Sequence, residues 1–150
     1  MRAVLQRVSE ANVKVDGREI GSIGTGLLIL LGVEPEDGSE DVNWLCQKVS
    51  KMRIFPDSEG LMNRSIMDVG GEFLVISQFT LHASTKKGNR PSYIKSARPD
   101  IAEPLYEQFM ERLWMESHLP VKSGKFGADM KVQLINDGPV TILIDSKNKE

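Results

Sequence analysis

The sequence has few cysteines and histidines, the residues that form disulfides and supply thiolate and imidazole ligands for metal ions. Cys46 is the only cysteine among 150 residues, which excludes an intrachain disulfide and any site built from several thiolates. It lies on the apolar face of a candidate helix, a position typical of a small core residue. His82 and His118 are the only histidines, and no pattern of acidic residues surrounds either of them. We therefore expect neither a metal ion nor another cofactor.

Long hydrophobic runs are also missing. The longest covers residues 27–31, far short of the ~20 apolar residues that a helix needs to span a bilayer. Polar residues interrupt the first apolar stretch, residues 3–8, too early for the hydrophobic part of a secretion signal. The sequence thus predicts a soluble, cytoplasmic protein that contacts no membrane.

The net charge of −2 argues against a protein that coats nucleic acid generally, because neutralising phosphates requires positive charge. One stretch, residues 73–99, nevertheless lacks Asp and Glu altogether. It carries five basic residues, namely Lys86, Lys87, Arg90, Lys95 and Arg98. Two interpretations stand: a solvated loop that happens to lack acids, or a local surface that binds a polyanion.

The first third of the chain has the alternation typical of strands. Residues 3–8 follow a period of two, which resumes over residues 13–15 after a break. Asp16-Gly17 is a hairpin turn signal before a second strand over residues 20–23. Residues 27–31 are apolar throughout, as in a central strand buried on both faces.

Two segments have helical periodicity. The first is predicted over residues 40–51, with capping-box spacing between Asp37 and Glu40 and with Ser39 as a competing N-cap. The second is predicted over residues 99–117, and Pro104 is tolerable there only within the first turn. Its expected apolar stripe consists of Ile101, Leu105, Phe109 and Leu113.

The remaining elements are predicted strands and one loop. Short strands are expected near residues 53–55 and 73–76, and two more over residues 131–135 and 140–144. Residues 85–99 form a polar, basic loop. Many strands and two main helices that do not alternate strictly favour one α+β domain over the whole chain, with a largely antiparallel or mixed, barrel-like sheet.

Familiar nucleotide-binding and hydrolase motifs are missing. The glycines of Gly21-Ser22-Ile23-Gly24-Thr25-Gly26 have the wrong spacing for a phosphate loop and lead into a strand, so they are better interpreted as turn glycines. There is no Walker lysine motif and no nucleophile elbow. A serine hydrolase that pairs Ser77 or Ser84 with His82 remains an open alternative.

Two polar segments are harder to explain by folding alone. Ser77-Gln78-Phe79-Thr80 follows an apolar strand, and N–H groups exposed at such a strand end can bind the oxyanion of an attacked carbonyl. Asn136-Asp137-Gly138-Pro139 is a strong turn sequence at the expected tip of a hairpin. A cis Gly-Pro bond there would turn two carbonyl oxygens the same way and let the tip hold an ammonium group. A polar strand end and an ordinary tight turn are the structural alternatives.

Together, and in this order, these segments resemble the D-aminoacyl-tRNA deacylase family over nearly the whole chain. Lys125 departs from the family pattern, where arginine is common, and residues 146–150 are an extra tail. The segments that carry the resemblance are Leu5-Gln6-Arg7-Val8, Gly26-Leu27-Leu28, Arg53-Ile54-Phe55, Ser77-Gln78-Phe79-Thr80-Leu81, Phe126-Gly127-Ala128-Asp129-Met130 and Asn136-Asp137-Gly138-Pro139-Val140-Thr141.

The resemblance implies a homodimeric hydrolase with active sites at the subunit interface. Such enzymes cleave the ester between a D-amino acid and the terminal adenosine of tRNA, without a metal or cofactor. Ser77, Gln78, Phe79 and Thr80 would line one subunit's pocket, and Gly138-Pro139, joined by a cis bond, would enter from the other. Arg7 would fix the Gly-Pro loop, and Phe126 would lie near the mouth.

A pocket of this kind would select handedness by exclusion, leaving no space for an L side chain while a D side chain points to solvent. Glycine, which has no side chain, would not be excluded. Water, Thr80 or the ribose hydroxyl are alternative sources of the attack. Lys86, Lys87 and Arg90 are expected to contact tRNA phosphates. The rival interpretations are a non-catalytic tRNA-binding module of the same fold and a conventional serine esterase.

Overall fold

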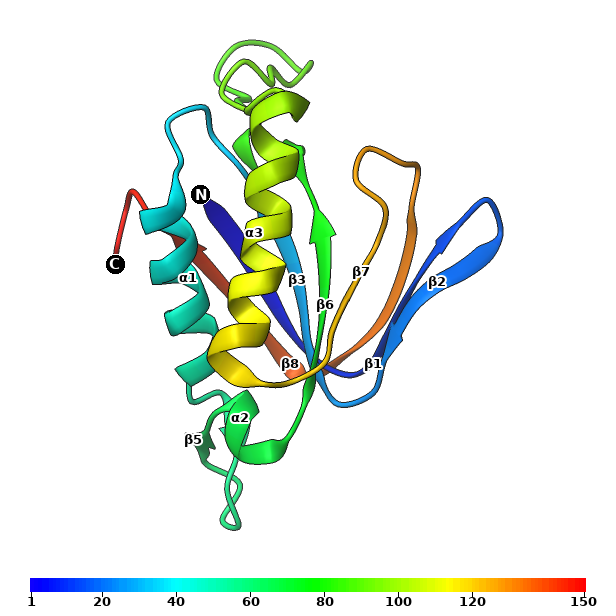
Figure 1. The fold of residues 1–150 in the computed structure, drawn as a ribbon, viewed down its shortest axis with the longest axis vertical. Helices are drawn as coiled ribbons and strands as arrows, with labels where there is room; N and C mark the ends of the chain where they lie inside the picture. Colours follow the sequence, from blue (N-terminus) through cyan, green and yellow to red (C-terminus); the bar gives the residue numbers. More distant parts are fainter.

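The computed structural model describes all residues, 1–150. Figure 1 shows a strongly curled sheet with two long helices, α1 and α3, packed against one of its faces. This is the predicted α+β fold with a mixed, barrel-like sheet, and the structure adds a short third helix, α2. In chain order the elements are β1 (Arg2–Val15), β2 (Arg18–Ile23), β3 (Gly26–Gly32), α1 (Ser39–Lys51), β4 (Phe55–Pro56), β5 (Met62–Arg64), α2 (Ile66–Val69), β6 (Glu72–Ser77), the 3-10 helix η1 (Phe79–His82), α3 (Pro99–Ser117), β7 (Val121–Ser123) and β8 (Lys131–Asp145).

The sheet is organised around β1, which pairs with three other strands. Residues 2–8 of β1 run antiparallel to β3, and residues 11–15 run antiparallel to β2. β8 runs antiparallel along the opposite edge of β1. β3 then pairs in parallel with β6, and β6 in parallel with β7. β1 is continuous, although the sequence predicts a break after residue 8.

The prediction of two C-terminal strands around a hairpin tip is wrong. β8 is one strand whose pairing with β1 jumps from Asn136, opposite Val8, to Thr141, opposite Gln6. Residues 137–140 of β8 therefore stand opposite Arg7 alone and form a bulge. Turn-forming composition could not reveal this, because both flanks of the bulge pair with β1 instead of with each other.

Two hydrophobic cores lie on opposite faces of the sheet. The larger one fills the space under α1 and α3 and includes Cys46, which is fully buried as the sequence predicts. The smaller one lies within the curl of the sheet and includes Leu28 and Leu74. Since side chains alternate along a strand, β3 and β6 contribute to both cores. This explains why their sequences are continuously apolar.

The start of α1 differs in detail from the prediction. The helix covers residues 39–51, but its N-cap is Gly38, whose N–H donates to the Asp41 side chain at 2.9 Å. The predicted capping box between Asp37 and Glu40 is wrong. The Asp37 carboxylate accepts from the N–H of Glu34 at 2.7 Å and also binds the Met1 ammonium.

The bounds of α3 agree with the prediction, but its buried face is rotated. Ala102, Tyr106, Phe109 and Leu113 are buried, whereas Ile101 is exposed. Pro104 lies within the helix beyond its first turn, where the sequence argument did not allow it. The residue is exposed, so water can satisfy the carbonyl that loses an N–H donor.

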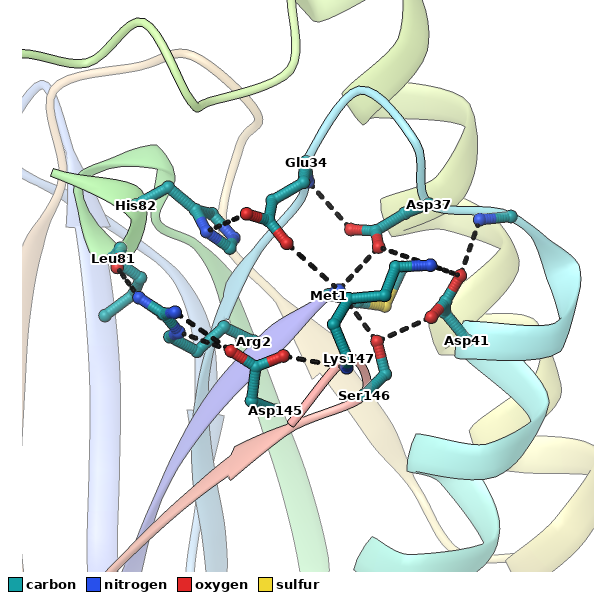
Figure 2. Close-up of polar contacts among 11 residues, drawn as sticks. Met1, Arg2, Glu34, Asp37, Asp41, Leu81, His82, Asp145, Ser146 and Lys147 are labelled. Atoms are coloured by element: carbon teal, nitrogen blue, oxygen red, sulfur yellow. Dashed lines mark hydrogen bonds and ion pairs between the residues drawn. The ribbon is translucent and has the colours of Figure 1, made fainter. Parts of the chain in front are cut away.

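Charged groups from both chain ends meet beside α1 (Figure 2). The fully buried Met1 ammonium donates to Asp37 and, at 2.8 Å, to Ser146 Oγ. Ser146 Oγ and Lys147 Nζ donate to the Asp41 carboxylate at 2.6 and 3.0 Å. Burial tends to raise the pKa of Asp41, but these bonds and one from a backbone N–H outweigh it and lower the pKa to about 2.

Acid should therefore destabilise the fold between pH about 4 and about 2. The depressed pKa gives a stabilising contribution that is complete above the ordinary aspartate pKa and is lost as the pH falls through the folded-state pKa. Urea unfolding across this range measures the effect. Asp41→Asn should be less stable at pH 7 and should lose this part of the pH dependence; an unchanged pH dependence would assign the effect to other groups.

Candidate active site

The candidate site begins where β6 ends at Ser77 and the chain turns into η1. Between them, Gln78 donates its N–H to Leu31 O of β3 at 2.8 Å, and its side-chain amide donates to Thr80 Oγ1. Because β3 and β6 are parallel, this segment lies at the carboxyl ends of both strands. Ligand sites in sheets with parallel strands form preferentially at such ends.

The N–H groups of Phe79 and Thr80 are the candidate oxyanion-binding donors. They occupy the first two positions of η1, where a helix provides no acceptors for its own N–H groups. Neighbouring groups hold the turn in place: Ser96 Oγ donates to Phe79 O at 2.8 Å, and the N–H of Ala83 donates to Thr80 O at 3.0 Å. Two adjacent donors on a fixed turn can stabilise charge that develops on a carbonyl oxygen.

An apolar cavity of about 590 Å³ lies beside this turn. Its walls come from the ends of β3 and β6, the first turns of α3, residues 126–130 and the end of the basic loop. The volume is in the range of small-molecule sites, and most of the lining is hydrophobic. The polar residues of the lining include Ser77, Gln78, Ser96, Arg98 and Asp129.

Aromatic pairs form two walls of the cavity. Phe79 and Tyr93 meet edge to face with ring centroids 5.2 Å apart, and Tyr106 packs against Phe126 at 5.8 Å. The Tyr106 hydroxyl donates to Val75 O at 2.9 Å. Burial raises the pKa of Tyr106 to about 12, with a hydrogen bond to a serine opposing the shift. Tyr106 therefore stays neutral near pH 7 and forms part of the cavity wall.

Arg7 holds the bulge of β8 that contains the Gly-Pro pair. Its Nε donates to Asp137 O at 2.9 Å and its Nη1 donates to Ile54 O at 2.7 Å. The Gly138–Pro139 bond is cis, as the resemblance implies, and both residues are exposed. An arginine that is itself 8% exposed thus fixes the base of a loop whose outer part faces solvent.

Asn136 closes the same bulge from within β8. Its side-chain oxygen accepts from the N–H of Val140 at 3.2 Å, and its amide donates to Gln6 at 2.9 Å. Thr141 Oγ1 also binds the Gln6 side chain. The two sequence segments around Gln6-Arg7 and Asn136–Thr141 therefore form one structural unit, through contacts between residues more than 120 positions apart.

The structure places the predicted site residues in two separate groups within one chain. Ser77, Gln78, Phe79 and Phe126 line the cavity. Thr80 follows them on η1, although its side chain is held by Gln78 and it is not among the lining residues. The second group lies at the β8 bulge, outside the cavity, and consists of Arg7, Gly138 and Pro139.

The predicted basic loop is present between η1 and α3. Ser84 and Ser92 pair through two backbone hydrogen bonds of 2.8 and 2.9 Å and close its outer part. Lys86, Lys87 and Arg90 are all exposed in the segment so closed. The inner part of the same loop carries Tyr93 and Ser96, which reach the cavity. The loop therefore connects an exposed basic segment to the candidate site.

The structure does not assemble the serine-hydrolase alternative. His82 is 2% exposed, its Nδ1 lies 3.4 Å from a Glu34 oxygen, and its buried Nε2 has no hydrogen-bond partner. Neither Ser77 nor Ser84 hydrogen-bonds to it. No three His, Cys, Asp or Glu side chains lie close enough to hold a metal ion. No helix has the length and apolar character needed to cross a bilayer.

Sequence reasoning missed the residues that the basic loop and α3 contribute to the cavity. Tyr93 and Ser96 have the character of ordinary loop residues. The one distinguishing feature is that Tyr93 is an aromatic residue within a basic loop. Tyr106 did carry a signal, since a tyrosine on a buried helix face needs a partner for its hydroxyl. Tyr106 was missed because the predicted apolar stripe of α3 is rotated from its buried face and does not include this residue.

The curled mixed sheet and the apolar cavity at the ends of its parallel strands define the chain as an α+β protein with a candidate site in this cavity. The chain belongs to the D-Tyr-tRNA(Tyr) deacylase family, whose model matches residues 4–145. It is accordingly an enzyme of the hydrolase class.

Full-length relatives support this assignment. The D-aminoacyl-tRNA deacylases of Bacteroides thetaiotaomicron and Parabacteroides distasonis are 61% and 57% identical, over 100% of this chain and of each relative. Residues 146–150 are therefore not an extra tail with respect to these two relatives. A solved structure named c-Myc DNA Unwinding Element Binding Protein is 40% identical, covers 97% of this chain and 98% of its own, and superposes with a TM-score of 0.90.

Replacing Gly138 should disturb the bulge. This residue has φ +130°, and an added Cβ would lie 2.8 Å from Arg7 Nη2 and 2.9 Å from Val140 Cγ2. Gly138→Ala should lower the free energy of unfolding by about 1–3 kcal/mol and displace Arg7. Urea denaturation measures the loss. Gly24→Ala is the matched control, because its nearest contact would be at 3.7 Å and its φ is not positive; equal stability of the two variants would contradict the steric argument.

Proposed function

We propose that residues 1–150 act as one domain that hydrolyses the ester between a D-amino acid and tRNA, as a quality-control step of translation. The observation that carries the proposal is the apolar cavity bounded by Ser77, Gln78 and Phe79, in a chain that matches D-aminoacyl-tRNA deacylases along its whole length. The cavity suits the terminal aminoacylated nucleoside, a group with an apolar face and few charges.

The chemistry requires stabilisation of an oxyanion more than an activated nucleophile, because an aminoacyl ester is already reactive. Water attacks the acyl carbon, and the N–H groups of Phe79 and Thr80 hold the oxyanion that forms. The bond from the acyl carbon to the ribose oxygen then breaks, the ribose oxygen takes the proton that the attacking water loses, and the free amino acid leaves. The Thr80 hydroxyl accepts a hydrogen bond from Gln78 and is not assigned as the nucleophile. An acyl-enzyme trapped on Thr80 by acid quenching would overturn this assignment.

Selection for D-amino acids is proposed to come from the Gly138–Pro139 bulge of a second subunit. Gly138 and Pro139 are exposed and lie outside their own chain's cavity. The same strand exposes Ile135 and Leu143, at 53% and 64%, which are apolar side chains suited to a homodimer contact. The carbonyls of the pair would hold the substrate ammonium and leave no space for an L side chain. A fully active monomer in sedimentation experiments would exclude this arrangement.

The deciding experiment follows amino-acid release from matched D-tyrosyl- and L-tyrosyl-tRNA, and from glycyl- and L-alanyl-tRNA. Rapid release is expected from the D-ester and from glycine, which has no side chain to exclude, while both L-esters resist. Protein that binds tRNA but leaves the D-ester intact would be a non-catalytic module. Equal resistance of glycyl- and L-alanyl-tRNA to hydrolysis would contradict selection by steric exclusion. Loss of activity with serine-directed reagents would favour a serine esterase.

The exposed basic segment is proposed to contact phosphates near the 3′ end of tRNA. Replacing Lys86 and Lys87 together by Ala should weaken binding and reduce the slope of log K against log salt by about 0.7 for each lost contact to a single strand. Fluorescence anisotropy with tRNA across a salt series measures this slope. Lys14→Ala/Lys48→Ala removes the same charge from exposed sites outside this loop and is the control; identical slopes for the two double variants would remove the loop from the interface.

A further inference from the structure

The carbonyl end of η1 is held by a residue outside the segments that form the candidate site. Arg2, at the start of β1, donates from Nη1 to Leu81 O at 2.7 Å. Leu81 directly follows Thr80, whose N–H is a candidate oxyanion donor. The last carbonyls of a helix have no donors within it, so an external cation is a favourable partner for this group.

Arg2 is itself fixed by Asp145, the last residue of β8. Nε and Nη2 of Arg2 donate to Asp145 Oδ2 at 3.0 and 2.9 Å, and the N–H of Lys147 donates to the other carboxylate oxygen at 2.9 Å. Figure 2 shows the guanidinium between Asp145 on one side and the Leu81 carbonyl on the other. Arg2 and Asp145 are also direct partners across the β1–β8 pair, so the strands set their positions.

Additional contacts hold η1 at its other residues. Ser96 Oγ donates to Phe79 O, and the buried His82 ring lies beside Glu34. A 3-10 turn of four residues has weak internal hydrogen bonds, so its orientation depends on such external contacts. The hydrogen bond from Arg2 is charge-assisted, and it goes directly to a backbone carbonyl of η1.

We propose that Arg2 is a positioning residue for hydrolysis, which, with Asp145, keeps η1 oriented so that the N–H groups of Phe79 and Thr80 point at the reacting carbonyl. The inference rests on the proposed function. Arg2 does not line the cavity, so it acts on the substrate only through η1. A displacement of about 1 Å in such donors can lower the rate by about 100-fold, because an oxyanion hole depends on short, well-aligned hydrogen bonds.

Arg2→Gln is the informative variant, and Arg18→Gln, an exposed arginine of β2, is its control. Under single-turnover conditions with D-tyrosyl-tRNA, Arg2→Gln should lower the hydrolysis rate by about 10- to 100-fold per folded molecule and change KM by less than about two-fold. Arg2→Lys should restore only part of the rate, since an ammonium cannot bridge carboxylate and carbonyl with the fork of a guanidinium. A rise in KM with an unchanged rate would instead make Arg2 a tRNA contact and overturn the proposal.

Asp145→Asn tests whether Asp145 affects the hydrolysis rate through Arg2 or independently of it. If Asp145 acts through Arg2, the double variant Arg2→Gln/Asp145→Asn should hydrolyse the substrate no more slowly than Arg2→Gln alone, because the effects of coupled residues do not add. Additive losses would overturn the proposed coupling. Equal rates per folded molecule for wild type and Arg2→Gln would reduce Arg2 to a stabilising residue and would also overturn it.

A substrate-free measurement keeps this inference distinct from the proposed function. Hydrogen exchange and ¹⁵N-resolved amide shifts of residues 79–82 should change in Arg2→Gln, with exchange at least about 10-fold faster, and should stay unchanged in Arg18→Gln. Unchanged η1 amides in Arg2→Gln would refute the inference whatever the activity. Wild-type protein that fails to hydrolyse D-tyrosyl-tRNA would refute the proposed function, while the exchange data would still decide whether Arg2 holds η1.

Discussion

The antiparallel pairing of β1 with β8 is the interaction on which the other features depend. It joins the two ends of the sequence along both strands, and its register shifts opposite Arg7 and again between Val8 and Glu10. Because β1 also pairs with β3, the same strand fixes the position of the parallel pair β3 and β6, at whose ends the cavity lies. The bulge and the cavity are therefore built on one rigid sheet.

The site depends on backbone groups that are held by charged side chains, with few titratable groups in the cavity itself. Arg7 fixes the bulge through Asp137 O, and Arg2 fixes η1 through Leu81 O. In both cases a guanidinium on β1 donates to a carbonyl of a segment far along the chain. A guanidinium suits this task because it stays charged and offers several N–H donors in a fixed plane.

Local sequence patterns predicted most elements, including the hairpin at Asp16-Gly17, the buried β3 and the bounds of α3. They also identified Ser77, Gln78 and Phe79, which line the cavity, whereas Phe126, another lining residue, followed only from the family resemblance. The predictions that were wrong or incomplete concern residues whose partners lie far away in the sequence. The composition of residues 136–139 predicts a turn, but only the pairing of both flanks with β1 makes it a bulge. Tyr106 and Arg2 were missed because their roles depend on hydrogen bonds that they donate to carbonyls of distant segments.

β8 has one free edge, since β1 is the only strand that pairs with it. A long, flat edge would offer a continuous row of unpaired backbone groups to other chains and would favour aggregation. The bulge divides this row near its middle, and Pro139 contributes no N–H. The segment that presents Gly138 and Pro139 to solvent therefore also breaks the continuous row of backbone groups that a further strand would need for pairing along the longest strand of the protein.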